Sequence, residues 1–204
     1  EDCSGGGDPV DAVELASQVQ DASLPAHERL RAVHALLERC LTASIGAELR
    51  LLTKPAFIGA VLDLLAGVDR LQLLPVKLLG CIALAPEASG ALESLDALGA
   101  VLAVLRAADE PLLVGASAQL VASVAREPGA ARRLCGRAGS VRVLLRLLWS
   151  WCHDPEVVLP LLGIFDGALR LPVHRVVLGS RVAIAGEEAP VRLVPALKRF
   201  VRRS

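Results

Sequence analysis

The chain has 204 residues, of which 53% are hydrophobic and only 2% aromatic, and its formal net charge is zero. This length suits one sizeable domain or one short array of repeats. So few aromatic rings give no sign of a surface for stacking nucleic-acid bases. The charge is uneven: residues 1–127 hold 9 Lys or Arg and 17 Asp or Glu, whereas residues 128–204 hold 13 and 5. This charge asymmetry either steers a partner toward the protein, or it only reflects two solvated surfaces that happen to differ in charge.

The five cysteines are odd in number and scattered, and no two of them form a Cys-x-x-Cys pair. This pattern argues against a disulfide framework and against a cysteine-based zinc site. It favours a reducing compartment, so we expect a cytoplasmic or nuclear protein. No apolar run reaches the roughly eighteen residues of a membrane span, and the first residues lack the features of a signal peptide. Because the chain opens without Met, we expect an excerpt of a longer chain or a processed form.

The first forty-five residues predict a flexible lead followed by two capping helices. The glycine run in residues 1–8 is typical of a linker. Within residues 9–45, Asp8-Pro9 can start a helix that runs to about Gln20, and apolar spacing predicts a second helix over 25–41. The expected buried face of the second helix holds Leu30, Val33, Leu37 and Leu41.

A heptapeptide beginning with glycine then recurs at a fixed interval of forty residues, which is the strongest signal in the sequence. Its copies are Gly59–Leu65, Gly99–Leu105 and Gly139–Leu145, and Gly179-Ser180 follows at the same interval with a poor match after it. Each copy opens a helix with apolar residues at helical spacing. The expected buried stripes are Val101, Leu102, Val104 and Leu105 in the second copy, and Val141, Leu144, Leu145 and Leu148 in the third.

Two further helices are predicted in each forty-residue unit. A long helix follows each heptapeptide and is apolar on more than one side, which is typical of a helix buried between neighbours. These long helices are predicted over 75–85, 112–126 and 156–169. A proline then breaks the chain, and a short helix follows it. The prolines are Pro86, Pro128 and Pro172, and the short helices are predicted over 87–97, 130–138 and 173–178.

This unit of a short, a second and a long third helix resembles the armadillo repeat, with the two-helix HEAT repeat as its close neighbour. The likeness rests on the pattern Ala-Leu/Gly-Ala-Val-x-x-x-Leu at 97–105 and at its equivalents. The resemblance implies an all-α fold, a right-handed α-solenoid with a period of about 40 residues. It covers residues 46–186, divided at about 46–85, 86–126, 127–169 and a partial 170–186, within one domain overall.

A basic capping helix is expected over residues 187–204. Apolar spacing predicts an amphipathic helix over 189–201, although Pro195 fits only its first turn, so the helix is kinked or starts late. Leu193, Val194, Leu197 and Val201 are expected to face inward, and Arg192, Lys198, Arg199, Arg202 and Arg203 outward. The outward set can meet an acidic partner, a phosphate backbone or an anionic membrane, or it is an ordinary solvated face.

The resemblance also implies a binding groove on the concave side, lined by the third helices. Members such as importin alpha, which bind nuclear-localisation peptides, carry Trp and Asn one turn apart there. This chain has no Asn, and the matching positions are Lys77 and Cys81, then Gln119 and Ser123, so we do not expect a generic nuclear-import receptor. The candidate groove residues are Lys77, Gln119, Ser123 and Arg126, with solvated polar positions as the alternative.

Trp149 and Trp151 are a further candidate contact, because tryptophan is enriched at interface hot spots. Since they are two residues apart they point to different sides of a helix, and the alternative is that both pack between repeats.

No catalytic motif is present in the sequence. There is no phosphate-binding Gly-x-x-x-x-Gly-Lys-Ser/Thr loop and no complete nucleophile elbow. His27 and His34 are seven apart rather than four, and the adjacent residues in Cys152-His153-Asp154 cannot line up as a relay. We therefore expect no enzyme, no cofactor and no metal site.

The expected function is a non-catalytic scaffold or adaptor that binds a partner peptide or protein on the concave surface. One alternative is a structural spacer or dimerisation segment of a larger complex. The other, the least favoured of the three, is contact with nucleic acid or an anionic membrane through the basic C-terminal helix, and we do not expect a nucleic-acid partner.

Overall fold

The computed structural model describes residues 11–42, 50–67, 71–136, 138–170, 181–182 and 191–192. Within these residues the chain is helical apart from two strands of two residues each, so the predicted all-α class is confirmed. The elements are α1 (Ala12–Gln20), α2 (Ala26–Thr42), α4 (Pro55–Gly67), α5 (Leu73–Ile82), the 3-10 helix η1 (Pro86–Ala88), α6 (Ser89–Ser94), α7 (Ala97–Ala107), α8 (Pro111–Val124), α9 (Pro128–Gly136), α10 (Ala138–Ser150), α11 (Pro155–Arg170), β1 (Arg181–Val182) and β2 (Val191–Arg192).

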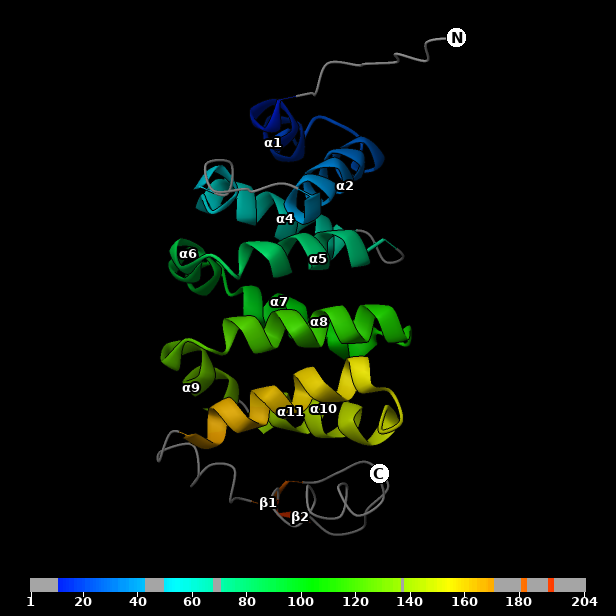
Figure 1. Ribbon diagram of the computed structural model, residues 1–204, viewed down its shortest axis with the longest axis vertical. Helices are drawn as coiled ribbons and strands as arrows, with labels where there is room; N and C mark the ends of the chain where they lie inside the picture. The colour runs from blue at the N-terminus through cyan, green and yellow to red at the C-terminus, as the bar shows by residue number, and fades with distance from the viewer. Residues whose placement is uncertain are drawn as a thin grey trace.

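The helices stack in chain order along the long axis of the molecule (Figure 1). One row runs α2, α5, α8, α11, and each helix in it packs against the next. A second row runs α1, α4, α7, α10, again with contacts between successive members. The shorter α6 and α9 lie at one side, where α6 contacts α4 and α7 and α9 contacts α10 and α11. Each internal helix of the two rows therefore buries surface against neighbours before and after it.

Proline and aspartate mark where the helices begin. Pro55, Pro86, Pro111, Pro128 and Pro155 each occupy the first position of a helical element. Proline is tolerated there because the first backbone N–H groups of a helix have no partner within the helix.

Aspartate caps the N-terminal ends of two helices by accepting a free backbone N–H. The N–H of Val13 donates to Asp11 Oδ1 at 3.2 Å at the start of α1. The N–H of Glu156 donates to Asp154 Oδ1 at 3.0 Å at the start of α11. These local bonds set the ends of helices that tertiary packing then holds in place.

The core follows the predicted apolar stripes. Val101, Leu102, Val104 and Leu105 are all buried in α7, and so are Val141, Leu144, Leu145 and Leu148 in α10. The predicted burial of the long helices on more than one side is confirmed for α8, which buries nine of its fourteen residues between α5, α7 and α11. A helix apolar on several sides needs neighbours on several sides, and the two rows supply them.

Side chains from one helix donate to the carbonyls of another, both between the two rows and within one row. Arg29 of α2 donates from Nε to the Val19 carbonyl of α1 at 2.9 Å and from Nη2 to the Ala60 carbonyl of α4 at 3.4 Å. Arg146 of α10 donates to the Arg106 carbonyl of α7 at 3.1 Å. Val19 and Arg106 lie in the last turns of α1 and α7, where carbonyls have no partner within the helix, so these two bonds satisfy otherwise free acceptors. Ala60 lies in the middle of α4, so the bond from Arg29 is an additional contact to a carbonyl inside a helix.

The C-terminal helix expected over 189–201 is wrong at the two residues that the structure describes. Val191 and Arg192 form β2, which pairs antiparallel with β1 in the register Arg181 to Arg192 and Val182 to Val191. Prolines at 190 and 195 flank this segment, and Pro195 would remove a hydrogen bond from the interior of the expected helix. The rest of 187–204, the lead 1–8, and the short helix expected over 173–178 lie outside the described residues.

The buried face expected for α2 needs one correction. Leu30, Val33 and Leu37 are buried, but Leu41 is 72% exposed. Helical spacing places Leu41 near the same side as the others. It lies in the last turn, and periodicity says nothing about how far along a helix its neighbours extend.

Two helical glycines provide a stability prediction with a built-in comparison. A Cβ at Gly59 of α4 meets no atom within 4 Å, whereas a Cβ at Gly115 of α8 lies 3.3 Å from the Glu156 carbonyl oxygen. We expect Gly59→Ala to raise the free energy of unfolding by about 0.5–1 kcal/mol, since glycine is a poor helix former. Gly115→Ala should gain clearly less, because α11 must move. Urea unfolding midpoints measure both, and an equal gain would contradict the close approach of α8 to α11.

Candidate functional site

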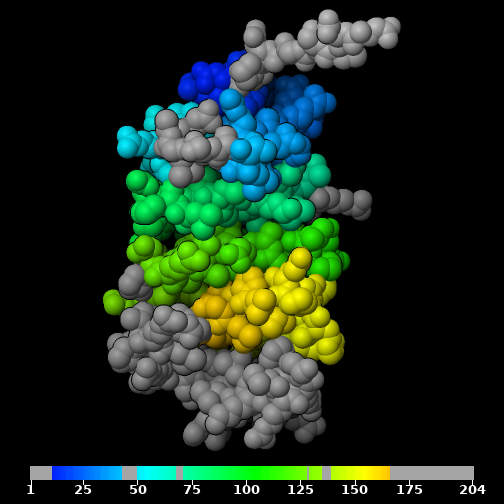
Figure 2. Space-filling view, in the orientation of Figure 1, coloured from blue at the N-terminus to red at the C-terminus, as the bar shows by residue number. Residues whose placement is uncertain are grey.

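The exposed side of α5 and α8, here called the α5–α8 face, carries the predicted groove residues. Lys77 on α5 and Gln119 on α8 are both exposed. The two helices are neighbours in the row that forms successive bands on the front of the molecule (Figure 2). Their opposite sides are buried against α4 and α7, so these two side chains lie on the same face. The residues share a surface because their helices share a row.

Three exposed leucines lie on or directly after helices of the same row. Leu84 after α5 is 63% exposed, Leu112 on α8 is 53% exposed and Leu159 on α11 is 67% exposed. Single exposed leucines are ordinary on a protein surface. Here they lie on or beside consecutive helices of one row, two of which also carry Lys77 and Gln119. The face therefore offers apolar area together with hydrogen-bonding groups.

A cavity of about 140 Å³ opens at the edge of this face, between the turn that follows α5 and the end of α8. Ser123, Arg126 and Glu127 line it from the α8 side, and Leu84 and Glu93 line it from the α5–α6 side. Ser123 is buried and Arg126 is exposed, so the cavity has a hydroxyl in its wall and a guanidinium at its rim. Of the four predicted groove residues, the structure brings Ser123 and Arg126 together here, and Lys77 and Gln119 do not line it.

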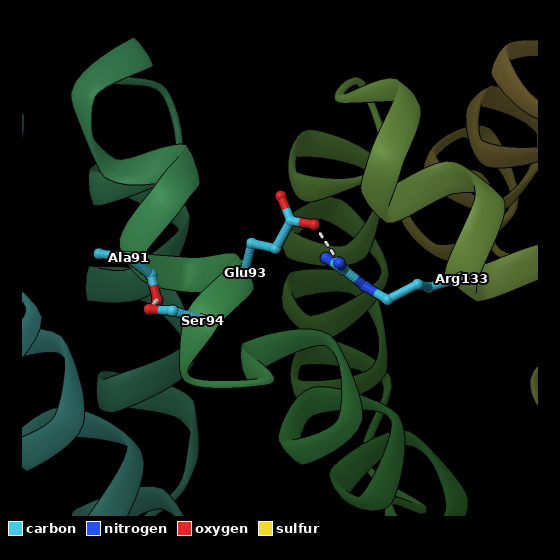
Figure 3. Close-up of polar contacts among 4 residues, drawn as sticks. All are labelled: Ala91, Glu93, Ser94 and Arg133. Atoms are coloured by element: carbon cyan, nitrogen blue, oxygen red, sulfur yellow. Dashed lines mark hydrogen bonds and ion pairs between the residues drawn. The ribbon is translucent and has the colours of Figure 1, made fainter.

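An ion pair spans the side of the cavity where α6 and α9 face each other. The carboxylate of Glu93 accepts a hydrogen bond from Arg133 of α9, forty residues later in the chain (Figure 3). Gly129 makes room for it, since a Cβ there would lie 3.2 Å from Glu93 Oε1. Both side chains are partly exposed, so solvent screens the pair and it contributes about 0–1 kcal/mol.

The two tryptophans lie at the end of α10. Trp149 is in the last turn of the helix, and Trp151 follows in the turn that leads to α11. Both are partly buried, and Trp151 packs against the hydrophobic core. This placement agrees with packing between α10 and α11 for Trp151.

The basic C-terminal candidates are placed only in part. Arg192 lies in β2, paired with Arg181 of β1. Lys198, Arg199, Arg202 and Arg203 lie outside the described residues. The prediction that these basic residues lie on a helix is therefore wrong for Arg192. It stays a prediction for the other four residues.

Residues 152–154 combine the side-chain types of a catalytic relay, Cys, His and Asp, and lie at the junction between α10 and α11. Asp154 caps α11, and His153 is exposed in the turn before it. In the described part of the chain no three His, Cys, Asp or Glu side chains come together in a way that would hold a metal ion. Across the same residues no single helix is long and apolar enough to cross a membrane. One pair, α5 with Pro86–Ser94, passes by length and composition but is bent by 112°.

Two cysteine side chains meet on the row of α2 and α5. Cys40 of α2 and Cys81 of α5 are both partly buried, and their thiols are hydrogen-bonded to each other. The bond from Cys40 lowers the pKa of Cys81 to about 7, and burial opposes this shift. Cys81 lies one turn after Lys77 and thus beside the α5–α8 face.

Sequence patterns did not find several residues of this region. Glu93, Glu127 and Arg133 were not predicted, and neither was the pairing of Cys40 with Cys81. A signal existed for the ion pair, because Glu93 and Arg133 are opposite charges separated by the forty-residue repeat interval. The same holds for the cysteines, which are forty-one residues apart near the ends of consecutive row helices.

No protein-family model, curated protein or solved structure matches this chain.

Proposed function

We propose that the chain is a non-catalytic interaction scaffold, a right-handed α-solenoid of armadillo type with three-helix repeats. Its α5–α8 face and adjoining cavity bind a partner protein or peptide. The observation that carries this proposal is the row α2, α5, α8, α11, whose outer side combines exposed leucines, polar side chains and a cavity.

The arrangement of helices supports the repeat interpretation. A helix of each type recurs along the chain, with α4, α7 and α10 in one row, α5, α8 and α11 in the other, and α6 and α9 at the side. Two contacts join equivalent places in consecutive units, Glu93 with Arg133 and the Arg106 carbonyl with Arg146, each across forty residues. Stacked repeats that contact their neighbours present a long continuous surface, and such surfaces suit extended partners.

The side chains suggest how a partner would be held. The amide of Gln119 can both donate to and accept from the backbone of an extended peptide. The leucines and the cavity can take apolar side chains, and Lys77 and Arg126 can pair with carboxylates. A central apolar contact surrounded by polar groups is the usual arrangement of a binding site.

The test is affinity capture with mass spectrometry, comparing the unaltered chain with a variant carrying Lys77→Glu, Gln119→Glu and Arg126→Glu. All three residues are exposed, so we expect the variant to fold. We expect it to lose the partner, with affinity reduced at least about tenfold, or about 1.4 kcal/mol, in a follow-up titration.

A matched control makes the same change in charge on the other row. Lys54→Glu, Ala103→Glu and Arg142→Glu alter exposed residues at or on α4, α7 and α10. This control should keep the partner. Loss from both variants would indicate a general charge effect and contradict a site on the α5–α8 face.

The remaining outcomes separate the alternatives. A partner kept by both variants would move the site to the tryptophans or to the basic C-terminal residues. Capture of no partner would favour a spacer or dimerisation segment of a larger complex. Salt-sensitive binding to DNA, RNA or anionic vesicles would favour the contact through the basic C-terminal residues.

A further inference from the structure

Cys40 and Cys81 form a thiol pair between α2 and α5, two consecutive helices of the row α2, α5, α8, α11. Cys40 lies in the last turn of α2 and Cys81 in the last turn of α5, and these helices pack side by side. Neither cysteine is in a disulfide, both pack against the core, and both keep part of their surface exposed. The thiols already contact each other through a hydrogen bond. The pair therefore has two properties that bond formation requires, proximity and access.

The environment also makes one member of the pair reactive. The hydrogen bond from Cys40 holds the pKa of Cys81 at about 7, although burial works against it. The thiolate rather than the thiol is the nucleophile, so Cys81 is partly in its reactive form near neutral pH. A reactive thiolate beside a second cysteine is the arrangement found in thiols that oxidise reversibly.

We propose that Cys40 and Cys81 form a reversible disulfide that joins α2 to α5 when the protein meets a peroxide. The Cys81 thiolate attacks a hydrogen peroxide oxygen, the O–O bond breaks, and Cys81 sulfenic acid and hydroxide form. Cys40 then gives up its proton, and its sulfur attacks the Cys81 sulfur. The S–S bond forms, the S–O bond breaks, and the oxygen leaves as water. Two thiols lose two electrons, and one hydrogen peroxide is reduced to two waters.

The reverse reaction needs a thiol reductant, such as glutathione or a dithiol. A reductant thiolate attacks one sulfur of the disulfide and forms a mixed disulfide, and a second thiol releases the protein cysteine. The protein returns to two thiols and the reductant becomes a disulfide. The bond would fix the spacing of α2 and α5 one turn from Lys77. The disulfide chemistry is independent of whether the α5–α8 face binds a partner.

The first test oxidises the unaltered full-length chain with hydrogen peroxide, blocks the remaining thiols with an alkylating reagent, and maps the peptides by mass spectrometry. We expect peptides containing Cys40 and Cys81 to be linked and the linked species to be two hydrogens lighter than its reduced parts. Dithiothreitol should restore both thiols. The chain should remain monomeric on a non-reducing gel, because the bond is internal.

The second test measures how the pair activates Cys81, by comparing iodoacetamide alkylation of Cys81 at pH 7 in the unaltered chain and in Cys40→Ala. A thiol of pKa about 7 is half ionised at pH 7, whereas one at the ordinary 9.0 is about 1% ionised. The weaker base is also a weaker nucleophile, so we expect a net decrease of about fivefold in the variant. Cys152→Ala is the matched control and should leave the rate at Cys81 unchanged.

Three results would overturn the proposal. The first is over-oxidation of Cys81 to sulfinic acid with no link to Cys40 in the unaltered chain. The second is a disulfide between chains in place of the internal bond. The third is equal alkylation of Cys81 with and without Cys40.

Discussion

Replacement of Leu120 by alanine should lower the free energy of unfolding by about 2–5 kcal/mol, the range for removal of a fully buried leucine side chain. Leu120 is 0% exposed, and its helix α8 packs against α5, α7 and α11. A cavity between helices that are held on both sides cannot collapse easily, so the cost should lie in the upper part of that range. Urea unfolding followed by circular dichroism measures the change.

Leu112 on the same helix provides the control. It is 53% exposed, so Leu112→Ala should change the free energy of unfolding by no more than about 0.5 kcal/mol. Because α8 packs against α5, α7 and α11, the loss of stability at Leu120 should also spread unevenly through the stack of helices. Hydrogen exchange should rise in α5 and α11 more than in α1. Equal costs for both substitutions would contradict the burial of α8 between its neighbours.

The positions of the long helices could be predicted because proline residues and the spacing of apolar residues indicate them in the sequence. The long helix predicted over 112–126 is observed as Pro111–Val124, and that predicted over 156–169 is observed as Pro155–Arg170. Proline fixes the start of each, and apolar residues on several sides show that each is enclosed. The end of α5 differs from the prediction: the helix was expected to reach Ala85 and ends at Ile82.

The exposure of individual side chains was harder to predict. Ser123 was expected in a groove and is buried, at 6% exposure, in the wall of a cavity. Leu41 was expected in the core and is exposed. Helical spacing gives the angle of a residue around its own helix. It does not give the distance to the next helix, which decides both cases.

The contacts between helices could not be predicted from the sequence pattern, for the same reason. Glu93 and Arg133 are separated by the forty-residue sequence interval, but the sequence pattern does not show that Gly129 leaves the space in which the Glu93 carboxylate lies. The proximity of Cys40 and Cys81 depends on how α2 and α5 are offset along their axes. That offset comes from side-chain packing in three dimensions, which the spacing of residues in the sequence does not show.

The serine at 117 should make the protein less stable than alanine would. Its hydroxyl is 0% exposed, and it is one of two side-chain groups that are buried without a hydrogen-bond partner among the described residues, with Ser140 of α10 as the other. A buried hydroxyl that lacks a partner costs about 1–3 kcal/mol in protein mutational data. We therefore expect Ser117→Ala to raise the free energy of unfolding by about 1–2 kcal/mol, helped by the higher helix propensity of alanine.

Ser140→Ala should give a similar gain, and the two gains should add if the sites are independent. Ser94 is the control, because its exposed hydroxyl donates to the Ala91 carbonyl at 3.0 Å (Figure 3). Ser94→Ala loses this bond and gains helix propensity, so its effect should stay within about 0.5 kcal/mol. Urea unfolding midpoints of the three single variants and of the double variant Ser117→Ala/Ser140→Ala measure these changes in the free energy of unfolding. A loss of stability in Ser117→Ala would show that the hydroxyl has a partner in solution, and α8 would then pack less closely than its burial indicates.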